Sequence, residues 1–519
     1  MGARARSLAA PRAEATLPSW VAHLYAGDLA TFVRAHRHAR PPRHRPAALP
    51  PTIQGDRGSR GYGLHPYWSK KPHELLLKCL QAFTRPGDLV LDPFAGAGGL
   101  PLLAVRLGRP AIALDRSPAA AFIVDALAHV GPVGALDAAI DRLVAAAGIA
   151  ALYATRCPRC SGPADTAFAV WADVVRCGTC RRIQAHSPRV AACAGCQRAL
   201  RDAVRVGEEL VEVAGICRQG CRPSRFRGPP GPADLAAALS VRARGACAPR
   251  APFPPGLKTA ELFARGIQRI DQFYTSRNLV AMARLRAALE AAPEDGGPAL
   301  RLAWHAALVA TSLKAQHLEG GGGYLPGMYY VPPVRKERNA AGTLRRIARR
   351  LRRALDALPA DPPATRAPLQ VGIGDARDLS AIPAAAVDYV FLDPPYHGKV
   401  QYSELNFLWE AWLGACDDWR ADDLVVNAAR GQALERWDAG MACVVRACAR
   451  VCKPGAWLTL TYVPAGDTTP DRLWRVLGEA GFARQAGFDG VVVNRQRTYV
   501  QRTSRATAVD QVVHFRRTR

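Results

Sequence analysis

The chain has 519 residues, of which 49% are hydrophobic, and a formal net charge of +27. This length allows two or three domains, and the positive charge favours a polyanionic partner such as nucleic acid. Neither a membrane span nor a secretory signal is recognisable, so we expect no membrane association and a cytoplasmic, nucleoid-associated location. Fourteen cysteines in such a chain favour metal ligands or buried thiols over disulfides.

Two blocks of the chain alternate helices and strands at the spacing of a parallel sheet. In the first block we predict a helix at residues 72–83 and a strand at 89–91. A glycine-rich turn at 92–99, a second helix at 100–107 and a second strand at 111–114 follow. The second block contains apolar, β-prone runs at residues 369–371, 387–392, 457–463, 488–494 and 498–502. The pattern predicts one α/β sheet that is interrupted by an insertion.

The insertion and the tails are recognised by composition. Residues 152–255 are rich in Cys, Arg and Gly, residues 257–318 look helical, a flexible loop at Gly320–Gly323 follows, and residues 338–355 form a basic amphipathic helix. We predict a basic flexible N-terminal tail at residues 1–60, with a helical patch near Trp20–Ala35, and a C-terminal tail at 506–519. Between them the α/β domain has a cofactor-binding half at 61–148 and a catalytic half at 366–505. The two halves are separated by a zinc-ribbon insertion at 152–255 and by a helical, basic insertion at 256–365 that could recognise the target.

A short polar motif follows the buried run 387–392. It consists of Asp393, Pro394, Pro395 and Tyr396. Ligands of open α/β sheets bind at the carboxyl ends of strands, where an acid, two rigid prolines and an aromatic ring can hold, polarise and stack on a planar amine. The motif therefore suits methylation of an exocyclic amine on a nucleobase. Taken alone, it could also be only a stiff turn.

A glycine-rich loop follows the strand at 89–91 and opens a helix. Its candidate ligand contacts are Asp92, Pro93, Phe94, Gly96 and Gly98. Glycines let the backbone approach a ligand closely, and the helix N-terminus favours a negative group. Asp115 ends the next strand, where an acid can bind ribose hydroxyls of a dinucleotide or of S-adenosylmethionine. Asp375 and Ala376 follow a later strand and could contact an adenine ring, although Asp375 could equally cap a turn.

These motifs, together with His65–Pro72 before the first strand, resemble the DNA amino-methyltransferases. More narrowly, the chain is similar to adenine-specific DNA methylases with a zinc-ribbon insertion, through the segments Phe273–Leu279, Tyr329–Pro332 and Val400–Leu405. The resemblance implies a Rossmann-like class I methyltransferase sheet with an inserted zinc-ribbon and helical domain. It also implies that Tyr67 and Lys70 help to bind S-adenosyl-L-methionine. His397, directly after the tetrad, departs from the family pattern.

The eight cysteines between residues 157 and 221 are spaced as zinc knuckles. Cys157, Cys160, Cys177 and Cys180 form two C-x-x-C pairs that we expect to share one structural zinc. Cys193, Cys196, Cys217 and Cys221 offer a second, weaker set, so one or two ions are expected, and the sequence leaves open whether the pairs interleave.

The expected partner is double-stranded DNA, with phosphate contacts from the arginines of the basic helix, namely Arg345, Arg346, Arg349, Arg350 and Arg353. The expected activity is site-specific methylation of adenine N6 on a flipped base. The alternatives are methylation of cytosine N4, methylation of RNA at guanine N2 or adenine N6, and a zinc-containing nucleic-acid-binding protein with a degenerate methyltransferase fold.

Overall fold

The computed structural model describes residues 17–43, 45–55, 64–131, 133–186, 192–241, 247–292, 297–318, 322–356, 366–416, 418–462, 469–485, 488, 491–495 and 509–518. The chain divides into two compact units. Unit 1 comprises residues 1–130, 255–257 and 350–519, and unit 2 comprises residues 131–254 and 258–349. Within the described residues, no helix has both the length and the apolar character needed to cross a membrane.

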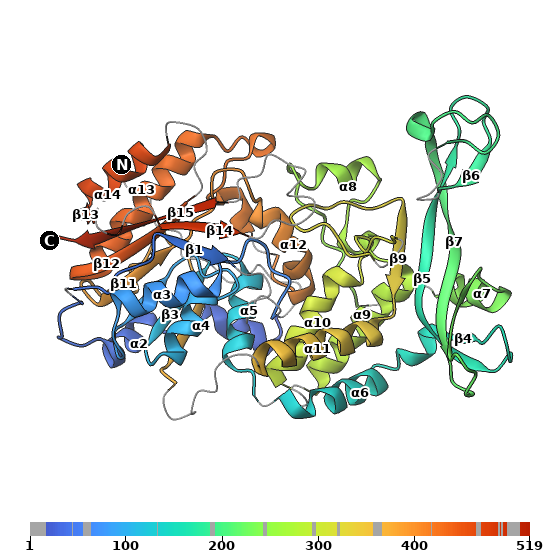
Figure 1. Ribbon diagram of the computed structural model, residues 1–519, viewed down its shortest axis with the longest axis horizontal. Helices are drawn as coiled ribbons and strands as arrows, with labels where there is room; N and C mark the ends of the chain where they lie inside the picture. Colours follow the sequence, from blue (N-terminus) through green and yellow to red (C-terminus); the bar gives the residue numbers. More distant parts are fainter. Residues whose placement is uncertain are drawn as a thin grey trace. The chain divides into compact units, whose positions relative to one another are not determined.

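Unit 1 is built on a nine-stranded sheet (Figure 1). Along the sheet the strands are β1 (Thr52–Gly55), β14 (Val491–Arg495), β15 (Val509–Arg517), β12 (Cys452–Tyr462), β11 (Val387–Leu392), β2 (Val90–Asp92), β3 (Ala111–Asp115) and β10 (Leu369–Ile373), with β13 (Phe482–Arg484) paired to β15. The five strands from β12 to β10 are parallel, whereas β15 is antiparallel to both neighbours. The expected Rossmann-like α/β sheet is confirmed.

Helices cover both faces of this sheet. In β11, Val390 and Leu392 belong to a core formed with α2 (Leu29–His36), α13 (Leu434–Val451) and α14 (Thr469–Glu479). The alternate residues Tyr389 and Phe391 belong to a second core with α3 (His73–Phe83) and α4 (Gly99–Arg106). Because side chains alternate along a strand and both faces are covered, β11 appears in the sequence as an unbroken apolar run. The unit also contains α1 (Ser19–Ala22), α5 (Pro118–Ala128) and α12 (Tyr402–Leu413).

Both ends of the chain contribute more structure than we expected. Within the predicted tail 1–60, residues 17–55 form α1, α2 and β1, and Trp20, Val21 and Val33 are buried. The predicted C-terminal tail contains β15, whose Val513 and Phe515 are buried in the core of unit 1. Both assignments as tails are wrong, because β1 pairs with β14, and β15 is inserted between β12 and β14. The strand expected at 498–502 and part of the loop at Gly320–Gly323 lie outside the described residues.

Unit 2 contains a six-stranded sheet and a group of helices. Its strands are β4 (Ala154–Arg156), β5 (Pro163–Arg176), β6 (Ile183–Ala185), β7 (Val204–Cys217), β8 (Arg225–Gly228) and β9 (Val334–Arg338). Its helices are α6 (Leu136–Ala146), α7 (Pro232–Ser240), α8 (Ala260–Ala264), α9 (Ser276–Ala291) and α10 (Gly297–Ala310), and α11 (Ala340–Asp356) follows β9. The long strands β5 and β7 form an antiparallel ribbon (Figure 1).

The structure joins the two insertions that we expected to be separate domains. β9, which comes from the helical insertion, pairs with β5 of the zinc-ribbon insertion along five residue pairs. The predicted border near residue 255 therefore does not separate two folded bodies within unit 2.

Candidate active site

The glycine-rich loop connects β2 to α4 with two residues in the left-handed backbone region. Gly96 has φ +51° and Gly98 has φ +76°, which favours glycine at both positions. A Cβ at Gly98 would lie 2.8 Å from Cγ2 of Val124, so this glycine lets the loop pack on α5. A Cβ at Gly96 would lie 3.2 Å from the ring of Tyr67. We expected a side chain at Gly98 to crowd the ligand, whereas it would clash inside the protein.

Asp115, at the end of β3, holds this loop in place. Its Oδ2 accepts a hydrogen bond from the backbone N–H of Gly96 at 2.9 Å, and its Oδ1 accepts one from the N–H of Ser117 at 2.9 Å. Burial raises the pKa of Asp115 to about 6, and burial also raises the pKa of Asp92 well above its ordinary value. The carboxyl ends of β2 and β3 thus present two acids, of which Asp92 is buried and Asp115 is partly buried.

One cavity in unit 1 contains most of the expected ligand-binding residues. The predicted site residues that line it are Tyr67, Lys70, Asp92, Pro93, Phe94, Gly96, Asp115, Asp375, Ala376, Asp393 and Pro395. Gly98, Pro394 and Tyr396 are not part of the lining. The strand order explains this gathering, because the parallel strands β10, β3, β2 and β11 all end at the same edge of the sheet.

Asp375 does not present the open carboxylate that we expected for an adenine ring. Arg377 donates to it twice, from Nε to Oδ1 at 3.0 Å and from Nη2 to Oδ2 at 2.7 Å. Burial acts against ionisation, but the hydrogen bonds from Arg377 prevail and lower the pKa of Asp375. Both oxygens therefore already have a charged donor.

Asp393 is held by three donors at a single oxygen. Its Oδ1 accepts hydrogen bonds from the hydroxyls of Tyr396 at 2.5 Å and Thr461 at 2.6 Å, and the ammonium of Lys71 lies 2.9 Å away. Lys71 also donates to the Tyr396 hydroxyl at 2.6 Å, and its Nζ lies 4.8 Å from the ring centroid. Lys71 and Thr461 were not among the predicted residues, although Lys71 lies inside the His65–Pro72 segment.

A buried polar network supports the cavity wall. Asn406 donates from Nδ2 to the hydroxyls of Tyr67 at 3.3 Å and Ser117 at 2.9 Å, and Ser117 donates to Oε1 of Glu410 at 2.6 Å. Asn406 and Glu410 come from α12, and both are fully buried. Sequence reasoning missed this network. The available signal was a pair of polar residues four apart inside an apolar helix.

The tryptophans of α12 belong to the core. Trp409 and Trp412 are both 0% exposed. Trp409 packs on the rings of His65 and Trp68 with centroid distances of 5.1 and 4.9 Å, so α12 supports the segment that carries Lys70 and Lys71. His397 packs on Trp437 at 4.5 Å.

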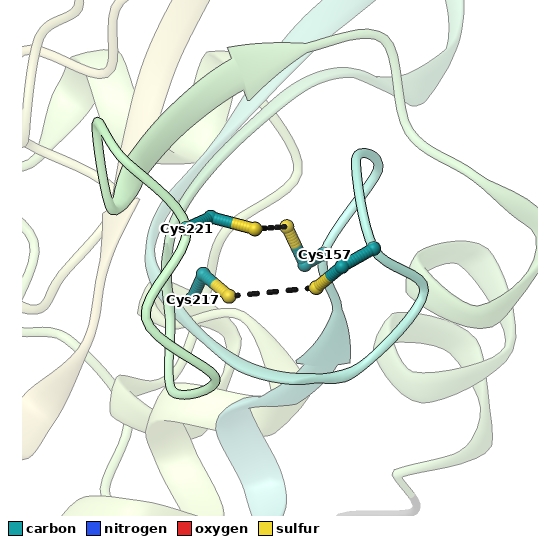
Figure 2. Close-up of side chains that lie close together, drawn as sticks. Cys157, Cys217 and Cys221 are labelled. Atoms are coloured by element: carbon teal, nitrogen blue, oxygen red, sulfur yellow. Dashed lines mark hydrogen bonds between the residues drawn. The ribbon is translucent and has the colours of Figure 1, made fainter.

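The eight knuckle cysteines of unit 2 form two groups of four. The groups are Cys157, Cys160, Cys217 and Cys221, and Cys177, Cys180, Cys193 and Cys196. Bridging sulfur pairs lie 3.4 to 4.0 Å apart, and Figure 2 shows the side chains of the first group pointing toward one another. This spacing is too long for a disulfide of about 2.05 Å and fits the edge, about 3.8 Å, of a tetrahedron with Zn–S bonds of about 2.3 Å.

This grouping differs from the one we expected, because the first two knuckles, Cys157/Cys160 and Cys177/Cys180, do not share a site. The first and last knuckles lie together, and the two middle knuckles lie together. The reason is the length of β5, whose 14 residues separate Cys160 from Cys177. At about 3.4 Å per residue the strand spans about 45 Å, so the two groups lie at opposite ends of the β5–β7 ribbon.

The basic helix forms where it was predicted. α11 spans Ala340–Asp356, with Leu344, Ile347 and Leu351 buried and the arginines of interest exposed, namely Arg345, Arg346, Arg349, Arg350 and Arg353. Arg345 pairs with Asp141 at 2.5 Å. The arginines of α11 therefore form an exposed, positively charged face.

The comparisons with known proteins concern parts of the chain. Residues 32–124 match the model of a DNA methylase family. A stretch of 53 residues, 10% of this chain, is 45% identical to the Type II methyltransferase M2.DpnII of Streptococcus pneumoniae. That stretch covers 19% of the relative, so the chain matches about a fifth of its length.

Two solved structures are similar at low identity. A SAM-dependent methyltransferase from Methanosarcina mazei is 13% identical over 33% of this chain and 76% of its own, with a TM-score of 0.19. The 16S rRNA (adenine(1408)-N(1))-methyltransferase from Catenulisporales acidiphilia is 15% identical over 33% and 73%, with a TM-score of 0.17. Both scores are too low to support an argument.

Proposed function

We propose, from the DNA methylase match of residues 32–124, that the protein transfers a methyl group from S-adenosyl-L-methionine to the exocyclic amine of adenine, N6, in DNA. The observation that carries the proposal is that Asp393 and the loop Asp92–Gly96 line the same cavity. An acceptor for a planar amine thus lies beside a loop suited to this cofactor.

The cavity residues fit S-adenosylmethionine. Asp115 can accept hydrogen bonds from the ribose hydroxyls, Gly96 lets the backbone approach the ligand, and Tyr67, Lys70 and Phe94 complete the wall. When bound, the cofactor supplies an electrophilic methyl group on its sulfonium.

Asp393 is oriented to receive the target amine. Its Oδ1 is occupied by Lys71, Tyr396 and Thr461, whereas no described residue donates to Oδ2. Oδ2 accepts one N–H of the amine, and the Pro394 carbonyl accepts the other. These two hydrogen bonds draw the nitrogen toward tetrahedral geometry and stabilise the positive charge that develops on it during attack.

The target base has to leave the duplex before it can reach Asp393. The Lys71 ammonium donates to the hydroxyl end of the Tyr396 side chain, and a flipped base would stack on a face of the ring. Pro395 fixes the turn between acid and ring, since Trp437 donates to its carbonyl at 3.0 Å. Positioning of the amine in line with the methyl group accounts for much of the acceleration.

Cytosine in DNA and bases in RNA are the alternative methylation targets. Cytosine N4 presents the same kind of amine to Asp393, and RNA bases could enter the same cavity. A non-enzymatic, nucleic-acid-binding role is disfavoured, because Asp393 and Asp115 both retain ordered donors at the cavity.

The two cysteine groups would each hold one structural zinc, because four thiolates close a tetrahedral site and leave no open position for catalysis. The exposed arginines of α11 would contact phosphates of double-stranded DNA. Each neutralised phosphate contributes about −0.9 to the slope of log affinity against log salt. Replacement of Arg349 and Arg350 by Ala should therefore flatten the slope by about 2.

The proposal is tested with purified protein, radiolabelled S-adenosylmethionine and unmethylated DNA or RNA. Digestion to nucleosides should recover the label as N6-methyladenine from DNA. Label in N4-methylcytosine or in RNA would establish an alternative, and an absence of label with Asp393 intact would favour the non-enzymatic role.

A further inference from the structure

The cofactor cavity contains one more carboxylate, which none of the expected roles uses. Asp423 follows the 3₁₀ turn Asp418–Asp422 and lines the cavity together with Asp115 and Arg116. It is only 7% exposed. Ser403 and the backbone N–H of Leu424 interact with its carboxylate, whereas its Oδ2 has no hydrogen-bond partner among the described residues. A buried carboxylate oxygen without a donor is costly, so a ligand that brings a donor would stabilise it.

The acids of the cavity form a series. Asp92 interacts electrostatically with Asp393 and with Asp115, and Asp115 in turn interacts with Asp423, which lines the same cavity. In S-adenosylmethionine the ribose lies between the sulfonium and the adenine. If the reacting methyl group lies toward Asp393 and the ribose at Asp115, the next acid in the series lies at the adenine end.

We propose that Asp423 accepts a hydrogen bond from the exocyclic amine of the cofactor's adenine. This inference rests on the proposed function, because it assumes that S-adenosylmethionine binds in the cavity. The acid that we first expected to read the adenine, Asp375, is engaged at both oxygens by Arg377. Asp423 offers what Asp375 lacks, an acceptor atom that is buried, in the lining and unsatisfied.

The amine can be tested without catalysis, because the demethylated product and its deaminated analogue differ only at this group and at the adjacent ring nitrogen N1, which gains a hydrogen. Isothermal titration of the full chain would compare S-adenosylhomocysteine with S-inosylhomocysteine, in which a carbonyl oxygen replaces the amine. The wild-type protein should prefer the adenosyl compound by at least about tenfold, since the carbonyl would face a carboxylate. In Asp423→Asn the preference should fall by about tenfold or reverse, because the amide can donate to that carbonyl.

Asp422→Asn is the matched control. Its carboxylate adjoins Asp423 in the chain but pairs with Arg377 and Arg436, so this variant should keep the wild-type preference. An unchanged preference in Asp423→Asn, or an equal fall in Asp422→Asn, would overturn the assignment. Wild-type protein that binds S-adenosylhomocysteine without preferring it refutes only this inference, whereas wild-type protein that binds neither compound refutes the proposed function as well.

Discussion

The nested arrangement of the cysteines predicts how double substitutions change the zinc content. In the structure Cys177 and Cys193 belong to one group, and Cys160 belongs to the other. Cys177→Ser with Cys193→Ser should therefore leave one zinc per chain, whereas Cys160→Ser with Cys177→Ser should leave none. If instead the first two knuckles shared one site and the last two shared the other, the two results would be exchanged.

The effect of losing one zinc ion on folding follows from the geometry of the two cysteine groups. Bridging sulfur pairs at 3.4 to 4.0 Å are already close to the edge of a zinc tetrahedron, so little rearrangement opposes binding. Structural zinc in small cysteine sites contributes roughly 10–16 kcal/mol of apparent folding free energy. Loss of a single thiolate should thus empty its site and unfold that end of the ribbon, while the other end, about 45 Å away along β5, stays folded.

The assay is metal analysis by mass spectrometry on protein purified without chelator, with X-ray absorption to measure the metal–sulfur distance. Two zinc ions in the wild-type protein, at about 2.3 Å from sulfur, are expected. The reasoning would be refuted by one zinc in the Cys160/Cys177 double variant together with none in the Cys177/Cys193 double variant.

Four further predictions concern the cavity. Asp393→Ala should lose at least about 3 kcal/mol of transition-state stabilisation in methyl transfer but keep S-adenosylhomocysteine affinity within a few-fold, and near-normal turnover would contradict its role. Lys71→Met should lower kcat/KM by roughly 10- to 100-fold, since a charge-assisted hydrogen bond contributes about 1.5–3 kcal/mol, and equal loss in Lys71→Arg would exclude a charge effect. Because a protonated carboxyl accepts ribose hydroxyls poorly, cofactor affinity measured by calorimetry should rise as pH increases through about 6, the raised pKa of Asp115, and a pH-independent wild-type affinity would refute this. Gly98→Val should lower the melting temperature by several degrees, because its side chain would meet Val124 in a left-handed backbone region, and an unchanged melting temperature would show that the loop can shift.

The parts of the fold that the sequence predicted well are those encoded locally. The strand at 387–392 was placed residue for residue, because both of its faces are buried and an acid follows it directly. The helix predicted at 338–355 differs from α11 by only two residues or fewer at each end, since its buried leucines recur at helical spacing.

The parts that the sequence did not predict depend on distant contacts. Lys71 reaches the hydroxyl of Tyr396, 325 positions further along the chain, and no local pattern reports such a contact. The cysteine grouping depends on whether the residues between two knuckles form an extended strand or fold back on themselves. The residues between Cys160 and Cys177 form the extended strand β5, which keeps these two knuckles apart. Asp375 is a case in which a local signal existed, because Arg377 stands two positions away.

The place of β15 in the sheet determines when the sheet can be completed during translation. This strand, formed by residues 509–517, pairs with β12, β13 and β14, so these three strands lack a neighbour until β15 has been synthesised. Similarly, β2 has to wait for β11, with unit 2 synthesised between them. During translation the cofactor-binding strands would therefore emerge long before their neighbours, with apolar edges exposed. A chain ending before residue 509 should be prone to aggregation, and unit 2 could fold on the ribosome while the sheet is still incomplete.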